Sequence, residues 1–277
     1  MPELPEVETI CKGLEKDLIG KTVKTVKANR KNLRVPFPRD LKSIEEQKIT
    51  SITRRAKYIL IHFKNSQTLI IHLGMSGRVT VTKKYEAQKH DHLLITLSSG
   101  KVIVLNDARR FGLVALCATE ELPQHKLFAH LGPEPLDKEF NPRYLDEKLK
   151  AKKIAIKLAI MDQAVVVGVG NIYVSEALFS ANIDPRRPAN KVKPEELKKL
   201  VSAIKQTLKK AIKAGGSSLK DYVQADGTMG YFQNMCKVYG RVGEKCPSCN
   251  CDIKKTGGIQ RIVQGGRASF YCAKKQK

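Results

Sequence analysis

Hydrophobic residues at helical spacing open the chain. Val7, Ile10, Leu14 and Leu18 recur every three or four positions and Gly20 follows them, which predicts an amphipathic helix over 5–19. From 22 to 117 the pattern changes to short apolar runs separated by turn residues such as Ser98-Ser-Gly100. Runs of this length and spacing predict an antiparallel β-sandwich. The clearest of them span 58–63, 68–72, 93–97 and 102–105.

The second half of the chain has a helical pattern. The break Leu131-Gly-Pro-Glu-Pro135 comes first, and Gly215-Gly-Ser-Ser218 interrupts the pattern again. Between them we predict helices over 142–150, 152–162, 171–181 and 194–214. The last segment is basic and rich in cysteine. The expected fold is therefore α+β with three domains: a sandwich at 1–130, a helical domain at 131–234 and a small finger at 235–277.

Charge narrows the class of partner. The 277 residues include 51 Lys and Arg against 27 Asp and Glu, a formal net charge of +24. Such an excess predicts a polyanionic partner, because basic side chains that neutralise phosphates release counterions. The alternative is a merely basic soluble protein, such as a ribosome-associated factor.

The N-terminal sequence and the lengths of the apolar runs predict where in the cell the protein lies. The first ten residues, MPELPEVETI, do not have the pattern of a signal peptide, and the apolar runs are too short to span a bilayer. We expect a soluble, cytoplasmic protein whose seven cysteines are reduced, so the cysteines that crowd together after 235 favour a metal site over disulfides.

The N-terminus carries a candidate nucleophile. Removal of Met1 would turn Pro2 into a secondary amine, which can attack an aldehydic carbon. An α-amino group is neutral more often than a lysine at pH 7, and the positive end of a following helix favours the neutral form further. Glu3 and Glu6 are the nearest carboxylates. By itself, however, Pro-Glu-Leu-Pro-Glu is also an ordinary helix start.

Motifs along the whole chain resemble those of the formamidopyrimidine-DNA glycosylase family, in that family's order. They are MPELPEVETI at 1–10, Arg54-Arg-Ala-Lys57-Tyr58, His72-Leu-Gly-Met-Ser-Gly77, Lys89-His-Asp-His92, Asp107-Ala-Arg-Arg-Phe-Gly112, Leu131-Gly-Pro-Glu-Pro-Leu136, Gly168-Val-Gly-Asn-Ile-Tyr173, Ser175-Glu-Ala-Leu-Phe179, Gly230-Tyr-Phe232, Val238-Tyr-Gly-Arg241 and Gly265-Gly-Arg267.

The resemblance implies a fold and an activity. The fold is a β-sandwich domain, a helix–two-turn–helix domain and a zinc-finger hairpin, with DNA between the two domains. The activity is base-excision repair: removal of oxidised purines such as 8-oxoguanine and formamidopyrimidines through a Schiff base, then β,δ-elimination at the abasic site. The implied partner is duplex DNA with such lesions or abasic sites, and the protein is expected to be a bacterial, nucleoid-associated monomer.

Two other functions stay open. One is a glycosylase for oxidised pyrimidines, of the endonuclease VIII type, although Leu4 stands where those enzymes usually have Gly. The other is a catalytically silent protein that only binds lesions, which the joint presence of Pro2, Glu3, Lys57 and Arg267 argues against.

The resemblance also assigns roles to single residues. It makes Pro2 the nucleophile and Glu3 the general acid, with Glu6 in support. Lys57 and Arg267 would contact the damaged nucleotide and its phosphate. Met75, Arg109 and Phe111 would fill the gap that an extruded base leaves. The other expected contacts with the DNA backbone are His90, Lys153 and Asn171, and the segment 215–228 would close over the flipped purine.

The finger departs from the family pattern. Cys246 and Cys249 form the first expected pair, but the second pair has Cys272 with Lys275 in place of its partner. Structural zinc prefers four ligands. Cys251 or Cys236 could supply the fourth thiolate, so zinc and a metal-free hairpin are both open. In the second case the hydrophobic side chains would hold the hairpin: Val238, Ile253, Ile259, Ile262, Val263 and Phe270.

Overall fold

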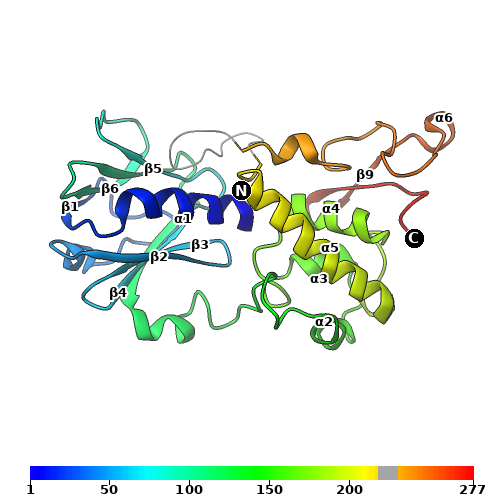
Figure 1. Cartoon of the computed structure of the whole chain (residues 1–277), viewed down its shortest axis with the longest axis horizontal. Helices are drawn as coiled ribbons and strands as arrows, with labels where there is room; N and C mark the ends of the chain where they lie inside the picture. Colours follow the sequence, from blue (N-terminus) through cyan, green and yellow to red (C-terminus); the bar gives the residue numbers. More distant parts are fainter. Residues whose placement is uncertain (218–229) are drawn as a thin grey trace. The chain divides into compact units, whose positions relative to one another are not determined.

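Residues 1–217 and 230–277 are described by the computed structural model in Figure 1. They form two compact units. The first contains Met1–Ala129 and Ile212–Gln233, and the second contains His130–Ala211 and Asn234–Lys277. Most of the 215–228 segment that is expected to close over the purine lies outside the described residues.

Helix α1, Leu4–Leu18, begins and ends one residue before the predicted bounds. Val7, Ile10, Leu14 and Leu18 are buried, as the spacing predicts. Pro5 stands in the first turn, where a helix does not need its missing N–H. The buried stripe of α1 belongs to the same hydrophobic core as the sheets.

Two four-stranded antiparallel sheets make up the sandwich and confirm the predicted architecture. Their orders are β1-β6-β7-β5 and β2-β3-β4-β8. Ile59, Ile61, Leu69 and Ile71 are fully buried at alternate positions of neighbouring strands, so one face of the second sheet lines the core. The strands are β1 (Val23–Ala28), β2 (Ile49–Arg55), β3 (Tyr58–Phe63), β4 (Gln67–His72), β5 (Arg78–Thr82), β6 (Asp91–Leu97), β7 (Val102–Asn106) and β8 (Leu113–Ala118).

Four α-helices precede the finger in the second unit, which holds all of them but the last two residues of the fourth: α2 (Pro142–Leu149), α3 (Ile156–Met161), α4 (Asn171–Ala181) and α5 (Pro194–Lys213). Three of them match the prediction closely. Helix α3 starts four residues later than predicted, because Ala155 is extended and pairs with Pro188. The Ile156 N–H then donates to Arg187 O at 2.7 Å. Short 3-10 turns lie at Leu41–Ile44, Thr119–Gln124, Ala189–Lys191 and Phe232–Met235.

The C-terminal finger packs on α4. It contains the short α6 (Ile253–Thr256) and the hairpin of β9 (Gln260–Gln264) and β10 (Arg267–Tyr271). Val238, Ile259 and Phe270 are buried around Phe179 of α4. Ile253 and Val263 are instead exposed, so the expectation that they help to hold the hairpin was wrong. No helix of the described residues is both long enough and apolar enough to cross a membrane.

Truncation of α1 tests the core of the first unit. Leu14→Ala is expected to lower the free energy of unfolding by about 2–5 kcal/mol, because a fully buried side chain leaves a cavity. Lys16→Ala, on the exposed side of the same helix, should change it by less than about 0.5 kcal/mol. Urea denaturation followed by circular dichroism measures both; equal losses would show that α1 is not part of the core.

Candidate active site and metal centre

Pro2 and Glu3 are buried directly before α1. Glu3 is the N-cap residue, and it forms a reciprocal capping box with Glu6. The Glu3 N–H donates to Glu6 Oε2 at 2.8 Å. The Pro2 nitrogen therefore lies beside the positive end of the helix, where the neutral amine is favoured once Met1 is removed. Glu6 thus bonds the residue next to Pro2, and its support of the Pro2 site stays a prediction.

Lys57 and His72 lie close together. Lys57 follows Ala56 in the tight turn between β2 and β3, and Tyr58 at the start of β3 pairs with His72 at the end of β4. Burial, and then the charges of Lys57 and Arg34, lower the pKa of His72 to about 4. The His72 ring is therefore neutral at pH 7.

The tautomer of His72 follows from its hydrogen bond. Gly74 N–H donates to His72 Nδ1 at 3.0 Å, so the proton is on Nε2. A half-buried neutral donor beside a lysine suits an anionic oxygen of a ligand. The sequence analysis gave His72 no role of its own, although its place in His72-Leu-Gly-Met-Ser-Gly77 was a usable signal.

Two loops present the expected gap-filling side chains to solvent. Met75 is 41% exposed and Phe111 is 45% exposed, which argues against the alternative of core packing. The Arg109 guanidinium lies 4.8 Å from the centre of the Phe111 ring. The two loops touch backbone to backbone: a Cβ on Gly74 would lie 2.4 Å from the Phe111 carbonyl carbon. Only glycine permits this approach at a φ of +59°.

Asp107 fixes both loops, a role that the sequence analysis missed. Its side chain is fully buried. Oδ1 accepts a hydrogen bond from Ser76 Oγ at 2.7 Å, and Oδ2 accepts one from Gly112 N at 2.8 Å. Arg109 N in turn donates to Ser76 Oγ at 3.3 Å. One carboxylate thus holds the residue that follows Met75 and the residue that follows Phe111.

His90 has a left-handed backbone, with a φ of +80°. Its carbonyl accepts the Asp107 N–H at 3.0 Å, and the neighbouring His92 bonds the Asp107 carbonyl through Nε2 at 2.8 Å. A non-glycine residue in this region stores strain, which is common at functional sites. The fold therefore places His90 beside the Arg109 loop.

In the second unit, Asn171 and Lys157 meet at the carbonyl of Ala268, the residue that follows Arg267. Asn171 is the first residue of α4, and its Nδ2 donates to Ala268 O at 2.9 Å. Lys157, which is fully buried, donates to the same oxygen at 2.9 Å and to Ser269 Oγ at 2.7 Å. These bonds hold β10, which begins with the exposed Arg267. The sequence analysis missed Lys157, since nothing in its pattern separates it from surface lysines.

The hairpin turn before Arg267 needs its glycines. Gly265 and Gly266 both have positive φ, of +52° and +72°, and Arg267 pairs with Gln264 across the turn. Lys153 is exposed in the turn between α2 and α3. The arrangement leaves two basic side chains, Arg267 and Lys153, directed at solvent rather than at acidic partners among the described residues.

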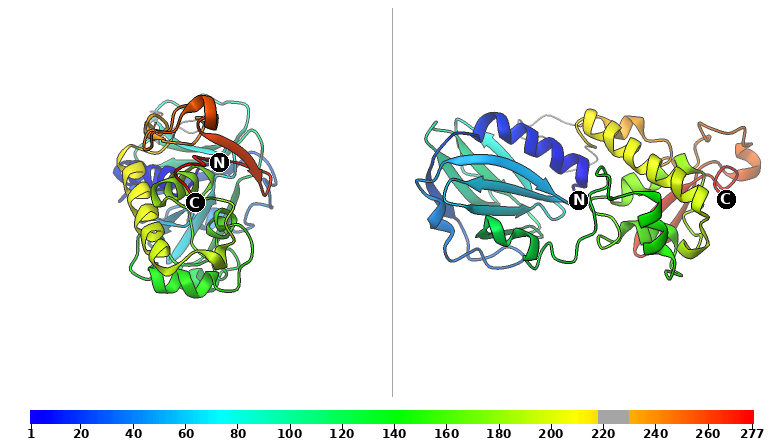
Figure 2. Two further views of the ribbon diagram at one scale, coloured as in Figure 1. Left: turned by 90° about the vertical axis from the view of Figure 1, so that its right-hand side faces the viewer. Right: turned by 60° about the horizontal axis from the view of Figure 1, so that its bottom comes forward.

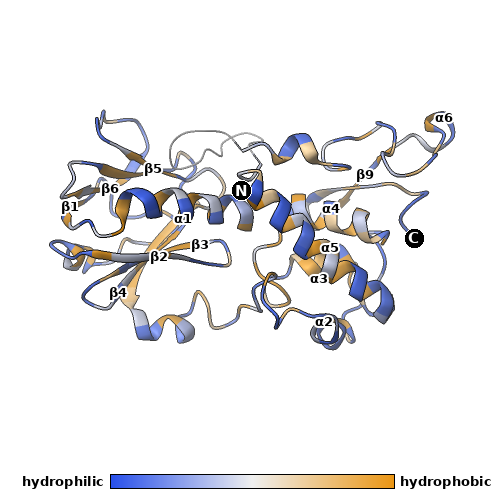
Figure 3. Ribbon diagram, in the orientation of Figure 1, coloured by the Kyte–Doolittle hydropathy of each residue, from blue (hydrophilic) through white to orange (hydrophobic). Residues whose placement is uncertain are grey.

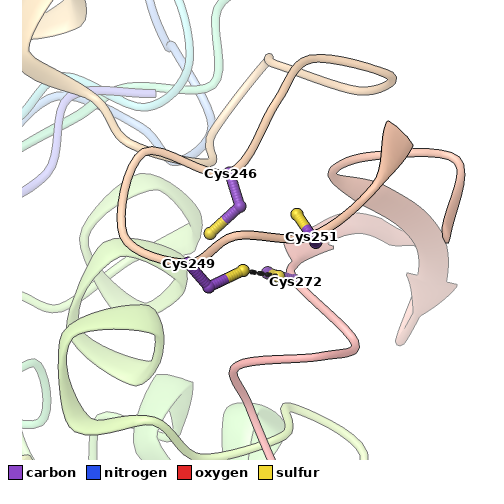
Figure 4. A group of neighbouring side chains, drawn as sticks. All are labelled: Cys246, Cys249, Cys251 and Cys272. Carbon is purple, nitrogen blue, oxygen red and sulfur yellow. Dashed lines mark hydrogen bonds between the residues drawn. The ribbon is translucent and has the colours of Figure 1, made fainter. Parts of the chain in front are cut away.

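Four cysteines converge in the finger (Figure 4). The sulfur atoms of Cys246, Cys249, Cys251 and Cys272 lie within 4.8 Å of one another, and those of Cys249 and Cys272 are 3.6 Å apart. A tetrahedral site with metal–sulfur bonds of about 2.3 Å needs sulfur atoms about 3.8 Å apart. The four thiols therefore fit one metal ion. Cys251 supplies the fourth, and Cys236 is not part of the cluster.

The crowded thiols have unequal affinities for protons. Burial, followed by the neighbouring thiols of Cys251 and Cys246, raises the pKa of Cys249 to about 12. A hydrogen bond with the Cys246 backbone lowers the pKa of Cys251. Lys275, at the position where the family has its fourth cysteine, instead lies with its Nζ 4.6 Å from the Phe179 ring centre.

Comparisons with known proteins cover most of the chain. The formamidopyrimidine-DNA glycosylase N-terminal domain matches residues 1–114, and the H2TH domain of the same glycosylases matches 131–223. Proteins named formamidopyrimidine-DNA glycosylase from Rhodospirillum rubrum and Ruegeria pomeroyi are each 47% identical, over 100% of both chains.

Comparisons with solved structures point to the same family. A Lactococcus lactis FPG mutant bound to Fapy-dG containing DNA is 34% identical, covers 100% of both chains and has a TM-score of 0.91. The Lactococcus lactis Fpg with abasic site containing DNA has a TM-score of 0.88 at the same identity and covers 99% of both chains.

Removal of the Asp107 carboxylate tests the loop anchor. Asp107→Ala should lower the free energy of unfolding by about 1–3 kcal/mol, because Ser76 and Gly112 lose a buried acceptor. Hydrogen exchange of the Gly112 amide should become faster. Asp107→Asn should recover part of the loss, since Ser76 can accept a bond from the new amide. Exchange at Gly112 that stays slow in Asp107→Ala would refute the anchor; the exposed Asp137→Ala is the control.

Proposed function

Because the chain belongs to the formamidopyrimidine-DNA glycosylase family, we propose that it removes oxidised purines from duplex DNA and then cuts the strand at the abasic site. The observation that carries this proposal is the buried Pro2–Glu3 pair before α1. Relatives from Lactococcus lactis bound to Fapy-dG and abasic DNA give independent support.

The proposed reaction starts at the sugar of the damaged nucleotide. The lone pair of the Pro2 amine attacks C1′, the N-glycosidic bond breaks, and the base leaves with the bonding electrons and a proton from Glu3. The amine proton then passes to O4′, the C1′–O4′ bond breaks as the nitrogen lone pair forms a C=N bond, and the ring-opened sugar is an iminium on Pro2. The iminium acidifies the adjacent C2′ proton, so β-elimination expels the 3′ phosphate. A second, δ-elimination expels the 5′ phosphate, and water finally releases the amine.

Other residues hold the substrate. We assign phosphate contacts to Lys57 in the first unit and to Arg267, Asn171 and Lys153 in the second, with His90 as a further contact. Arginine suits this task because its planar donors can grip a phosphate through two bonds. Met75, Phe111 and Arg109 would fill the space of the extruded nucleotide, and their exposure on tied loops fits that use.

The alternatives have less support. Leu4 and the Met75–Arg109–Phe111 set favour the purine enzyme over the pyrimidine enzyme. A silent lesion-binding protein would not need a buried Glu3 at a capped N-terminus. We place the enzyme on the chromosomal DNA of a bacterial cytoplasm, acting as a monomer.

Zinc is the proposed metal of the finger. Four thiolates in a tetrahedral arrangement select zinc among the common divalent ions, and the ion would stabilise the finger without taking part in the reaction. The proposed ligands are Cys246, Cys249, Cys251 and Cys272. Their role is to hold the finger that carries Arg267.

Borohydride trapping tests the chemistry. Incubation with a duplex that contains 8-oxoguanine opposite cytosine should give a covalent adduct on the peptide that begins with Pro2, located by mass spectrometry. Glu3→Gln should slow base excision about 10²–10⁴-fold, as expected for loss of a general acid, and should slow cleavage of a preformed abasic site less. Glu15→Gln, exposed on the same helix, should retain activity. An adduct on Lys57 instead would refute the nucleophile.

Metal analysis tests the fourth ligand. Zinc should be present at about one ion per chain in the wild type and be largely lost from Cys251→Ser, because three thiolates hold zinc less tightly. Cys117→Ser, a half-buried thiol of the first unit, is the matched control and should keep the ion. Unchanged zinc content in Cys251→Ser would show that Cys251 is not a ligand.

A further inference from the structure

Helix α5 has a strongly basic exposed side. Lys198, Lys199, Lys209 and Lys210 are all exposed, in two pairs near the two ends of the helix. These four residues are called the α5 lysine face below. In Figure 3, blue hydrophilic stretches alternate with pale and orange ones along α5, as expected when one side packs inward.

The acidic residues of α5 offset this face only in part, because just one of them, Glu195, is exposed beside the lysines. The helix has two, Glu195 and Glu196. Glu196 is held by Arg187, with Nη2 and Oε2 2.6 Å apart, and this hydrogen bond lowers the pKa of Glu196 to about 2. Within the described residues, no lysine of the α5 lysine face forms an ion pair. Four positive charges are thus available to a partner.

A groove beside the lysines offers further donors. It has a volume of about 560 Å³ and lies between α5 and the end of α4. Ser180, Ser202 and Gln206 line it with hydroxyl and amide groups, together with three of the four lysines and the single carboxylate of Glu195. Hydroxyl, amide and ammonium donors are the groups that contact the sugar–phosphate backbone of nucleic acids without reading sequence.

The dimensions fit a duplex. Eleven residues separate Lys199 from Lys210, which is about 17 Å along a helix. Duplex DNA carries one negative charge for about every 1.7 Å of its axis when both strands are counted. A stretch of duplex of this length therefore carries about ten phosphates on its two strands. A row of lysines of this length therefore matches several phosphates of one strand.

The α5 lysine face is separate from the contacts proposed above for this unit. Strand β10, with Arg267, packs on α4. The two views of Figure 2 show β9–β10 and α5 on different sides of α4. A duplex held by Arg267 and Asn171 does not use the lysines on the other side of that helix.

We propose that the α5 lysine face binds the backbone of a second, undamaged DNA duplex and lets the enzyme pass from one duplex to another. This proposal rests on the function proposed above, since only an enzyme that searches DNA needs such a transfer. Binding is electrostatic and independent of sequence, and it weakens as the salt concentration rises.

Salt dependence is the first test. The variant Lys198→Gln/Lys199→Gln/Lys209→Gln/Lys210→Gln should bind undamaged duplex with a slope of log K against log salt that is smaller by about two to four, since each lost phosphate contact removes about 0.9. The control, with four exposed lysines of the first unit changed to Gln (Lys16, Lys21, Lys27 and Lys64), removes the same charge. Its slope should change by less than about one. Equal changes in the two variants would overturn the proposal, because net charge alone would then explain them.

Competitor-dependent dissociation is the second test. The full-length protein is bound to a labelled duplex that contains a tetrahydrofuran abasic analogue, and unlabelled undamaged duplex is added. The dissociation rate of the wild type should rise several-fold with competitor concentration, while that of the lysine variant should stay constant. A wild-type rate that is independent of competitor would overturn the proposal.

Single-turnover cleavage separates the two proposals. With enzyme in saturating excess, the lysine variant should cut an 8-oxoguanine duplex within about twofold of the wild-type rate, because its active site is untouched. A wild type that cuts nothing would refute the proposed function, whereas its competitor-dependent dissociation would still report a second duplex site.

Discussion

The carboxylate of Glu6 holds the reactive end of the chain in place. Oε2 accepts the Glu3 N–H at 2.8 Å and Oε1 accepts the Ser217 N–H at 2.7 Å. Glu6 is buried, and a buried charge is tolerated only where hydrogen bonds replace its water. The start of α1 is thereby fixed to a segment more than two hundred residues away, in the same unit. Any chemistry at Pro2 depends on this anchor, because Pro2 has no side-chain donor or acceptor of its own.

The partner segment of Glu6 is itself tightly constrained. Phe232 N donates to Gly216 O at 2.9 Å, and Tyr231 N donates to Ala214 O at 3.0 Å. A Cβ on Gly230 would lie 2.3 Å from Gly216 O, so the two strands of chain approach too closely for any side chain there. Residues 214–217 and 230–232 are therefore joined next to Glu6. A side chain at position 230 would displace the chain at Gly216. The displacement would reach Glu3 through the two hydrogen bonds that Glu6 accepts, from Ser217 and from Glu3.

Two other buried carboxylates hold loops in the same way. Asp107 ties the Met75 and Phe111 loops. Glu176 on α4 accepts the N–H groups of Lys237, Val238 and Tyr239 at 2.8–2.9 Å and so fixes the start of the finger. In each case a buried carboxylate bonds backbone N–H groups that no strand or helix partner satisfies. Hydrophobic packing makes the sandwich and the helices, whereas these carboxylates set the positions of the loops between them.

This difference between elements held by hydrophobic packing and loops held by carboxylates explains which features the sequence could predict. The periodicity of Val7 to Leu18 and the apolar runs of the strands report burial, so elements stabilised by burial were predicted within a few residues. Helix α3 was predicted too long because its start depends on the long-range pairing of Ala155 with Pro188, which no local pattern encodes. Asp107, His72 and Lys157 were missed as site-forming residues for the same reason, since their roles arise from distant partners. Cys251 stayed one of several options until the fold brought its sulfur within 4.8 Å of the other three.

Four thiols come together in the finger although Lys275 stands where the family resemblance implies a cysteine. Lys275 would place a positive charge among thiolates if it pointed inward, but its ammonium lies over the Phe179 ring instead. Gln276 then fixes the chain end: its side chain accepts the Cys272 N–H at 2.8 Å and donates to Ile183 O at 2.8 Å. These two hydrogen bonds hold Cys272 in place, although the turn has no second cysteine. The fourth sulfur comes from Cys251, two residues before α6, so the hairpin that carries Arg267 joins Cys272 to the other three cysteines. The turn that carries Arg267 therefore lies between Cys251 and Cys272 of the thiol cluster.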